Sequence, residues 1–382
     1  MDFSDINKRK YRKKKEHGPP GTGMRAVIAL IALVAVCAAA YIASDLLRDR
    51  KVDKAVEKAA EIAEEEANSV KASVNLAVPL HSAYYILLQM PSEKDGYEKK
   101  ASWADLPSKP GDVEKKPYLH NQILMEKSPD EKMYPASMTK ILTAITVLEN
   151  IPDLDKKVTL IDRNFHHYYS DGATIAGYRA GDRVSLRDLL CGLMLVSGSE
   201  CAAALAEETA GNEEAFVALM NEKAAEIGMT ASRFANPVGL HDENNYSTVS
   251  DIAMLLDYAL QNRTFVEIFT SQEHVAEPTG SFPDGLTMRN HIFREELAQN
   301  ANATGDEVSQ PPDDFGADPG LVLGGKTGYV DESGQCLASL LSKGGVKFIL
   351  VTAAAMPENS RTQFLHAEDM RAVLASIRVS SS

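Results

Sequence analysis

Ser137 and Lys140 are the residues whose types and spacing most directly suggest chemistry. Pro135 precedes them and an apolar pattern of helical spacing follows, which predicts Ser137 at the first turn of a helix. Side chains three residues apart share one helix face, so the amine would lie beside the hydroxyl. A lysine can deprotonate a serine if burial, nearby positive charge and the positive helix terminus lower its pKa. Such a pair is expected about once by chance in a chain of this length, so alone it is weak evidence.

Two tripeptides add further hydroxyl and amino groups. Lys-Thr-Gly at 326–328 follows two glycines and precedes a predicted strand pair. A cation and a hydroxyl on an edge strand could hold a substrate carboxylate, and the alternative is a turn that leads into a hairpin. This tripeptide is expected only about 0.1 times by chance in a chain of this size. Ser-Gly-Ser at 197–199 lies between an apolar run and a helical pattern, and by itself it indicates only a helix boundary.

In this order, the three motifs resemble the Ser-x-x-Lys, Ser-Asp-Asn and Lys-Thr-Gly signature of β-lactamases and penicillin-binding proteins. Residues 134–140 (YPASMTK), 235–242 (ANPVGLHD) and 324–329 (GGKTGY) narrow the resemblance to the serine-type D-alanyl-D-alanine carboxypeptidases, which are low-molecular-mass penicillin-binding proteins. The resemblance covers roughly residues 78–378. It implies an α/β fold of the α+β type, in which helices flank an antiparallel sheet and form a helical subdomain.

The resemblance also implies a role for each catalytic residue. Ser137 would attack the peptide bond between the two terminal D-alanines of a peptidoglycan stem peptide. Lys140 would be the base, and Ser197 would relay a proton to the leaving amine. Water would then hydrolyse the acyl-enzyme without a metal or another cofactor, and β-lactam antibiotics would inhibit by acylating the same serine.

Substrate binding is implied for four residues. Lys326 and Thr327 would bind the terminal carboxylate, and Ser199 and Tyr329 would lie beside the substrate. The backbone N–H groups of Ser137 and Tyr329 would form the oxyanion hole.

The sequence departs from the family pattern in four places. Ser199 stands where the family usually has Asn, and Val330 stands where many relatives have Thr. The polar stretches 91–118 and 299–320 are long, and a second β-rich domain is not expected after the final helix. Because Ser199 is shorter and lacks an amide, it leaves open a non-catalytic protein that binds the cell wall. A β-lactamase is a further alternative, although no convincing carboxylate motif for rapid deacylation is present.

The elements that must position these residues follow from hydrophobic periodicity. Strands are predicted at 82–88, 121–126, 335–341 and 346–354, and helices at 137–150, 185–210, 212–227, 251–261 and 363–377. Strands near both ends with helices between them indicate a sheet that joins the two ends of the body.

The N-terminal region predicts a membrane protein. Residues 1–23 form a basic tail expected in the cytoplasm, and residues 24–47 contain an uncharged apolar run that would span about 27 Å as a helix. A cleaved signal peptide is the alternative, since three alanines at 38–40 offer a cleavage site. A charged, Ala-rich helix beginning near residue 45 and ending at Ala72 predicts a stalk, assigned to 48–75, and residues 76–382 are the expected catalytic domain. The protein is therefore expected to cross the lipid bilayer once, with its catalytic domain outside the cytoplasm.

Charge and cysteines restrict the remaining possibilities. The chain carries a net charge of −14 despite its basic tail, so the acidic body would repel nucleic acid. Two of the three cysteines at 191, 201 and 336 could form a disulfide, or Cys191, Cys201 and Cys336 could all remain buried thiols. Both possibilities stay open. The histidines at 166, 167 and 241 lack a third ligand at a useful spacing, so metal binding is not expected.

Overall fold

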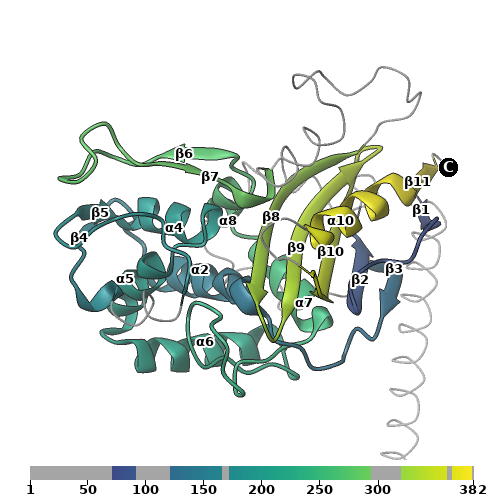
Figure 1. Ribbon diagram of the computed structural model, residues 1–382, viewed down its shortest axis with the longest axis horizontal. Helices are drawn as coiled ribbons and strands as arrows, with labels where there is room; N and C mark the ends of the chain where they lie inside the picture. The colour runs from purple at the N-terminus through teal and green to yellow at the C-terminus, as the bar shows by residue number, and fades with distance from the viewer. Residues whose placement is uncertain (1–70, 92–120, 166–171, 294–319, 359–363, 381–382) are drawn as a thin grey trace, which may run out of the picture. The chain divides into compact units, whose positions relative to one another are not determined.

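A five-stranded antiparallel sheet forms the centre of the body, with strand order β3-β2-β10-β9-β8 (Figure 1). Its strands are β2 (Tyr84–Gln89), β3 (Gln122–Lys127), β8 (Leu321–Val330), β9 (Gly334–Lys343) and β10 (Val346–Ala355). The four predicted strands are therefore confirmed, with ends that shift by a few residues. Strand β8 lies at one edge of the sheet, so its outer side is open to other parts of the chain.

The computed structural model describes residues 71–91, 121–165, 172–293, 320–358 and 364–380. The predicted basic tail, the membrane anchor and most of the stalk lie outside the described residues, as do most of the polar stretches 91–118 and 299–320. Within the described ranges, no helix combines the length and the apolar character needed to cross a membrane.

Alternation along the strands separates two cores on opposite faces of the sheet. Ile86 and Leu88 contribute to the larger core, whereas Leu87 between them contributes to the smaller one. Helix α10 (Leu365–Ser376) packs on the smaller core, and α7 (Val249–Ala259) packs on the larger one. The sheet is thus covered by a helix on each face, which is the arrangement that the sequence predicts.

A helical subdomain extends the larger core. Its other helices are α2 (Thr139–Asn150), α4 (Leu186–Leu195), α5 (Ser199–Ala210), α6 (Glu213–Ile227) and α8 (Arg263–Phe269). Helix α2 packs against α4, α5, α6, α7 and α8, and its residues 139–148 are all buried. A short 3-10 turn, η4 (Ala136–Met138), leads directly into this central helix. Because α2 has no exposed face over that length, its first turn is fixed from every side.

Small strand pairs complete the body. They are β1 (Lys71–Val74) with β11 (Ile377–Ser380), β4 (Lys157–Thr159) with β5 (Arg183–Ser185), and β6 (Glu273–Val275) with β7 (Thr287–Arg289). The prediction that the stalk helix continues to Ala72 is wrong for residues 71 and 72. They form β1 instead, because the pairing with β11 gives this segment a backbone partner and buries Ala72.

The predicted helix over 185–210 is also wrong in its middle. Helix α4 ends at Leu195 and α5 begins at Ser199, so residues 196–198 interrupt it. The Gly198 N–H donates to the Gly192 carbonyl at 2.9 Å, and the Ser199 N–H donates to the Thr174 carbonyl at 2.9 Å. Both helices bury apolar side chains up to the break, which is why the hydrophobic pattern does not reveal it.

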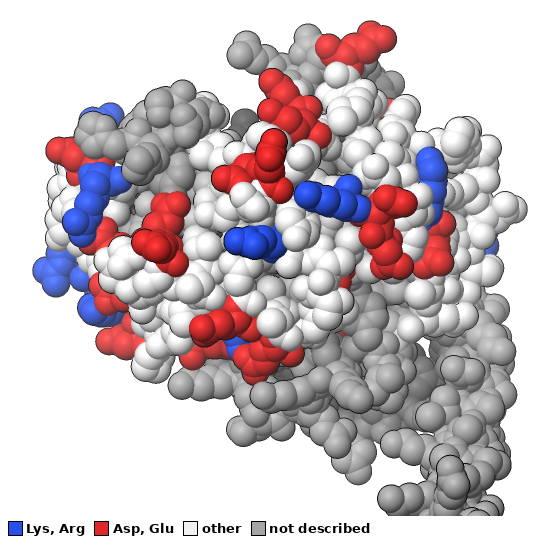
Figure 2. All heavy atoms as spheres, turned by 90° about the horizontal axis from the view of Figure 1, so that it is seen from below, with Lys and Arg blue, Asp and Glu red and all other residues white. Residues whose placement is uncertain are grey.

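The surface carries charges of both signs. On the face in Figure 2, acidic side chains form several groups with basic side chains between them. The described surface on this face therefore has no continuous basic track of the kind that follows a phosphate backbone.

Candidate active site

The central helix brings Ser137 and Lys140 together. Ser137 lies in η4 and is partly exposed, while Lys140 lies in the first turn of α2 and is buried. The distance between Lys140 Nζ and Ser137 Oγ is 3.1 Å. Lys140 Nζ also donates to the Val238 carbonyl oxygen at 2.6 Å. The amine is therefore fixed against the hydroxyl from which it would take a proton.

The surroundings of Lys140 favour its neutral form. Burial lowers the pKa of this amine well below its ordinary value, and the Lys326 ammonium lowers it further. Glu200 and Cys201 act in the opposite direction with smaller effects. Because a neutral amine has a free lone pair, these surroundings make Lys140 a base at a lower pH than a solvated lysine.

Ser197 and Lys326 form a second pair beside the first. Ser197 lies in the turn between α4 and α5, is buried and has a φ of 62°, in the left-handed region that a non-glycine residue rarely occupies. Lys326 is buried on edge strand β8, and its Nζ donates to Ser197 Oγ at 3.0 Å and to the Thr327 carbonyl at 2.8 Å. This contact joins the edge of the sheet to the helical subdomain.

Gly328 allows the edge strand to pass close to Ser137. A Cβ atom at Gly328 would lie 2.9 Å from the Ser137 backbone nitrogen and 3.0 Å from the Ala136 Cβ atom. Thr327 is partly exposed beside it, and Tyr329, the next residue after Gly328, is 42% exposed. The strand thus places the Lys-Thr-Gly motif along the serine, while the shared oxyanion hole of Ser137 and Tyr329 stays a prediction.

The loop 236–240 supports the site from the other side. Asn236 Oδ1 accepts the N–H groups of Val238, Gly239 and Leu240 at 3.3, 2.7 and 3.1 Å, which makes the loop rigid. Gly239 has a φ of 83°, and a Cβ atom there would lie 1.8 Å from the Ala136 carbonyl oxygen. The sequence of this segment carries part of the family resemblance, but it does not predict that the backbone of the segment holds Lys140. The signal was present, because Asn-Pro-Val-Gly is a turn sequence.

Ser199 lies near these residues but contributes differently. It is buried as the first residue of α5, two positions after Ser197. Its described contact is the backbone hydrogen bond to Thr174. The structure therefore places all seven predicted site residues on η4, α2, the α4–α5 turn, the start of α5 and β8.

The remaining sequence candidates lie outside this arrangement. Cys191, Cys201 and Cys336 are buried free thiols, so they form no disulfide. His241 packs its ring against Tyr134 with centroids 4.6 Å apart. Within the described ranges, no cluster of three or more His, Cys, Asp and Glu side chains could hold a metal ion. The histidines at 166 and 167 lie outside the described residues.

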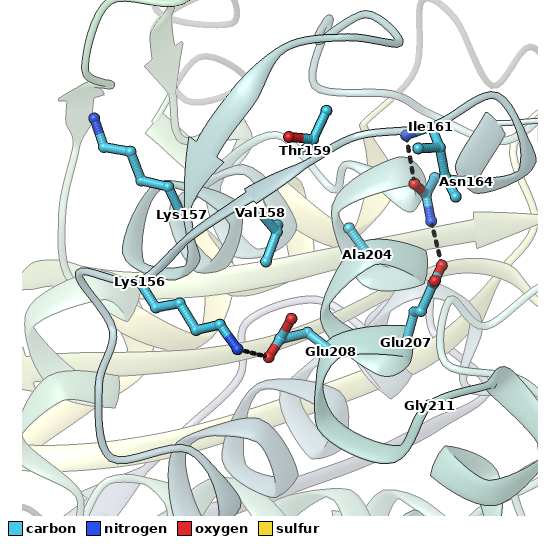
Figure 3. A pocket seen from close by; sticks show the side chains of 10 residues that line it. All are labelled: Lys156, Lys157, Val158, Thr159, Ile161, Asn164, Ala204, Glu207, Glu208 and Gly211. Atoms are coloured by element: carbon cyan, nitrogen blue, oxygen red, sulfur yellow. Dashed lines mark hydrogen bonds and ion pairs between the residues drawn. The ribbon is translucent and has the colours of Figure 1, made fainter.

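A cavity of about 430 Å³ lies between β4 and α5 (Figure 3). Asn164 accepts from the Ile161 N–H at 2.9 Å and donates to Glu207 at 3.2 Å, and Lys156 pairs with Glu208. None of the motif residues lines this cavity. Its main polar side chains are already paired with one another, so it does not compete with the serine site.

Comparisons with known proteins agree with this geometry. Residues 118–305 match the D-alanyl-D-alanine carboxypeptidase family. The D-alanyl-D-alanine carboxypeptidase DacF of Bacillus subtilis is 31% identical over 63% of this chain and 56% of its own length. The corresponding enzyme of Streptomyces sp. K15 is 29% identical over 61% of this chain and 76% of its own length. The chain thus spans little more than half of the Bacillus relative.

The fold has close counterparts among solved structures. The crystal structure of the Streptomyces K15 DD-transpeptidase superposes with a TM-score of 0.56 at 22% identity, covering 78% of this chain and 96% of that one. A D-alanyl-D-alanine carboxypeptidase from Mycobacterium tuberculosis also has a TM-score of 0.56 at 20% identity, covering 80% and 93%. The fold is shared with these structures, and the site places a buried lysine beside a serine. Over residues 118–305 the chain is thus similar to the D-alanyl-D-alanine carboxypeptidases, the low-molecular-mass penicillin-binding serine peptidases.

Replacement of Gly239 by alanine tests whether the loop 236–240 holds the site together. The added methyl group would collide with the Ala136 carbonyl, so the loop must move and the Val238 contact with Lys140 must weaken. We expect acylation of Ser137 by a fluorescent penicillin to slow by about 100-fold or more.

Gly211→Ala is the matched control. Gly211 has a φ of 82°, so backbone strain is similar, but a Cβ atom there meets nothing within 4 Å. Gly211→Ala should lose about 1 kcal/mol of unfolding free energy to this strain, and Gly239→Ala should lose that amount and the cost of the collision in addition. Equal acylation rates in the two variants would contradict a role for the loop.

Proposed function

We propose that this protein hydrolyses the terminal D-Ala-D-Ala bond of peptidoglycan stem peptides through a serine acyl-enzyme, in cell-wall synthesis and remodelling. The observation that carries the proposal is the buried Lys140 amine 3.1 Å from the Ser137 hydroxyl. Sequence similarity suggests the substrate class, since the curated relatives are named D-alanyl-D-alanine carboxypeptidases.

Acylation follows from the positions of the two lysines. Neutral Lys140 takes the proton of Ser137 while the serine oxygen bonds to the carbonyl carbon of the penultimate D-alanine. The buried Lys326 ammonium attracts the terminal carboxylate, and Thr327 beside it supplies a hydroxyl to the same group. Backbone N–H groups of Ser137 and Tyr329 would stabilise the oxyanion.

The leaving group and the acyl-enzyme require further proton transfers. The C–N bond breaks as the Ser197 hydroxyl, which accepts from Lys326, gives a proton to the departing amine of D-alanine and takes up the proton held by Lys140. Water then attacks the ester, and Lys140, neutral again, accepts the water proton and passes it to the Ser137 oxygen, which releases the shortened peptide and restores Ser137. β-Lactam antibiotics would acylate Ser137 by the same first step, with no second product to depart.

The direct test is release of D-alanine from a diacetyl-Lys-D-Ala-D-Ala peptide by the full-length protein. Ser137→Ala removes the attacking oxygen, so release should fall by at least about 1,000-fold. Ser271→Ala is the control, since the Ser271 hydroxyl bonds only the nearby Glu273 carbonyl.

Labelling of Ser137 by a fluorescent penicillin separates the alternatives. A folded wild-type protein that releases no D-alanine and takes no label is a non-catalytic wall-binding protein, and the proposal is then wrong. Rapid multiple-turnover hydrolysis of penicillin would instead make it a β-lactamase.

We further propose that residues 24–47 anchor the protein in the cell membrane, with the catalytic domain outside the cytoplasm. The support is the apolar run at 26–43 after a basic segment, which predicts a cytoplasmic N-terminus. Full-length protein should stay in the membrane fraction after alkaline carbonate extraction, and deletion of residues 24–47 should release it. Complete extraction of the full-length protein would refute the anchor.

A further inference from the structure

Glu200 is a buried acid beside the active site to which the mechanism above gives no role. It lies in the first turn of α5, directly after the Ser-Gly-Ser motif, and its residue exposure is 0%. A buried carboxyl group is costly unless it has partners or meets an opposite charge. Its surroundings therefore indicate what it does.

One oxygen of Glu200 holds a neighbouring segment in place. Oε1 accepts the backbone N–H groups of Ala176 and Gly177 at 2.7 and 3.0 Å. The same segment receives the Ser199 N–H at the Thr174 carbonyl. At Gly198, a Cβ atom would lie 2.8 Å from the Ala176 Cβ atom, so the two segments are in close contact. The carboxylate thus fixes the turn in which Ser197 adopts its left-handed conformation.

The other oxygen has a different environment. Oε2 is buried and has no hydrogen-bond partner among the described residues. Burial raises the pKa of this carboxyl, while the N–H groups of Gly177, Glu200, Ala176 and Cys201 favour its ionised form. A buried hydrogen-bond acceptor without a partner is costly, and a nearby positive charge can offset that cost.

Glu200 acts in this way on the Lys140 amine, whose pKa it raises. The titratable groups acting on Lys140 are Lys326 from β8 and Glu200 and Cys201 from α5, and the pKa of Cys201 is itself raised by burial. Tyr178, the other titratable group affected by Glu200, also has a raised pKa and stays neutral. Glu200 is therefore the acid that opposes the effects of burial and of Lys326 on the Lys140 amine.

The charges explain why such an acid is useful. Before the reaction Lys140 is neutral, so the positive charge of Lys326 and the negative charge of Glu200 balance each other. When Lys140 takes the serine proton, the site gains one positive charge as the substrate carbonyl gains one negative charge. Without the Glu200 anion, the same step would add a second cation to a buried site that already holds the Lys326 cation, which opposes proton transfer.

We propose that Glu200 is a positioning residue for this reaction: its carboxylate holds the Ser197 turn and supplies the negative charge that lets Lys140 accept the serine proton. The proposal rests on the serine peptidase function proposed above. It assigns the two oxygens separate tasks, so two substitutions can separate them.

Glu200→Gln keeps the acceptor for Ala176 and Gly177 but removes the charge. Glu200→Asp keeps the charge but is too short to reach both N–H groups. Glu208→Gln is the control, because Glu208 lies on the same helix in an exposed pair with Lys156.

The experiment measures the rate constant for acylation of full-length protein by a fluorescent penicillin from pH 5 to 9, with Tm as a control for folding. With Glu200→Gln, loss of the negative charge lowers the pKa of Lys140 further, so the acid limb moves to lower pH. The weaker base should slow the plateau rate by about tenfold. Glu200→Asp should lower Tm but leave the acid limb near its wild-type position, and Glu208→Gln should change neither.

A Glu200→Gln protein that folds and keeps both the wild-type plateau and the wild-type acid limb would overturn the inference. Loss of Tm without a shift of the limb would assign Glu200 a purely structural role and would also overturn it. A wild-type protein that folds but takes no penicillin at any pH would instead refute the proposed function, so the two failures are distinguishable.

Discussion

The burial of one lysine amine is the constraint on which the rest of this structure depends. Lys140 lies at the start of a helix that is packed on every side, so it cannot turn toward water without disrupting the subdomain. Its amine has a serine oxygen and the Val238 carbonyl within reach, and both tolerate a neutral amine as well as an ammonium. Burial makes the ammonium costly, and that cost is what gives the adjacent hydroxyl a base.

The second lysine shows how the sheet and the helices cooperate. Lys326 lies on an edge strand, where the backbone is not covered by a further strand, and it reaches across to Ser197. Gly328 lets that strand pass against the backbone of Ser137. Because its amine lies close enough to lower the pKa of Lys140, one residue orients Ser197, strengthens the effect of burial and, in the proposed function, binds the substrate carboxylate. The site therefore requires both the sheet and the helical subdomain.

The sequence predicts the part of the site whose residues lie close together along the chain. Ser137 and Lys140 are three residues apart on one element, so their proximity follows from helix geometry, and strand alternation predicts the sheet. The sequence does not predict contacts between distant segments. The Val238 carbonyl is a backbone group 98 positions from Lys140, and any residue type would carry it. Ser-Gly-Ser at 197–199 indicates a helix boundary, but apolar residues on both sides make the hydrophobic pattern predict one helix over 185–210. Pairing of β1 with β11 was hidden because the four residues of β1, with one lysine and one alanine, are too few to show a strand pattern.

The central claim is that Lys140 is a neutral amine when the enzyme acts. The most direct measurement is an NMR titration of the lysine side-chain ¹³Cε signals of the full-length protein, with the Lys140 signal assigned by its loss in Lys140→Arg. The Lys140 signal should titrate at a pH well below that of the solvated lysines, as its burial and the Lys326 charge require. A Lys140 signal that titrates together with the solvated lysines would contradict the claim.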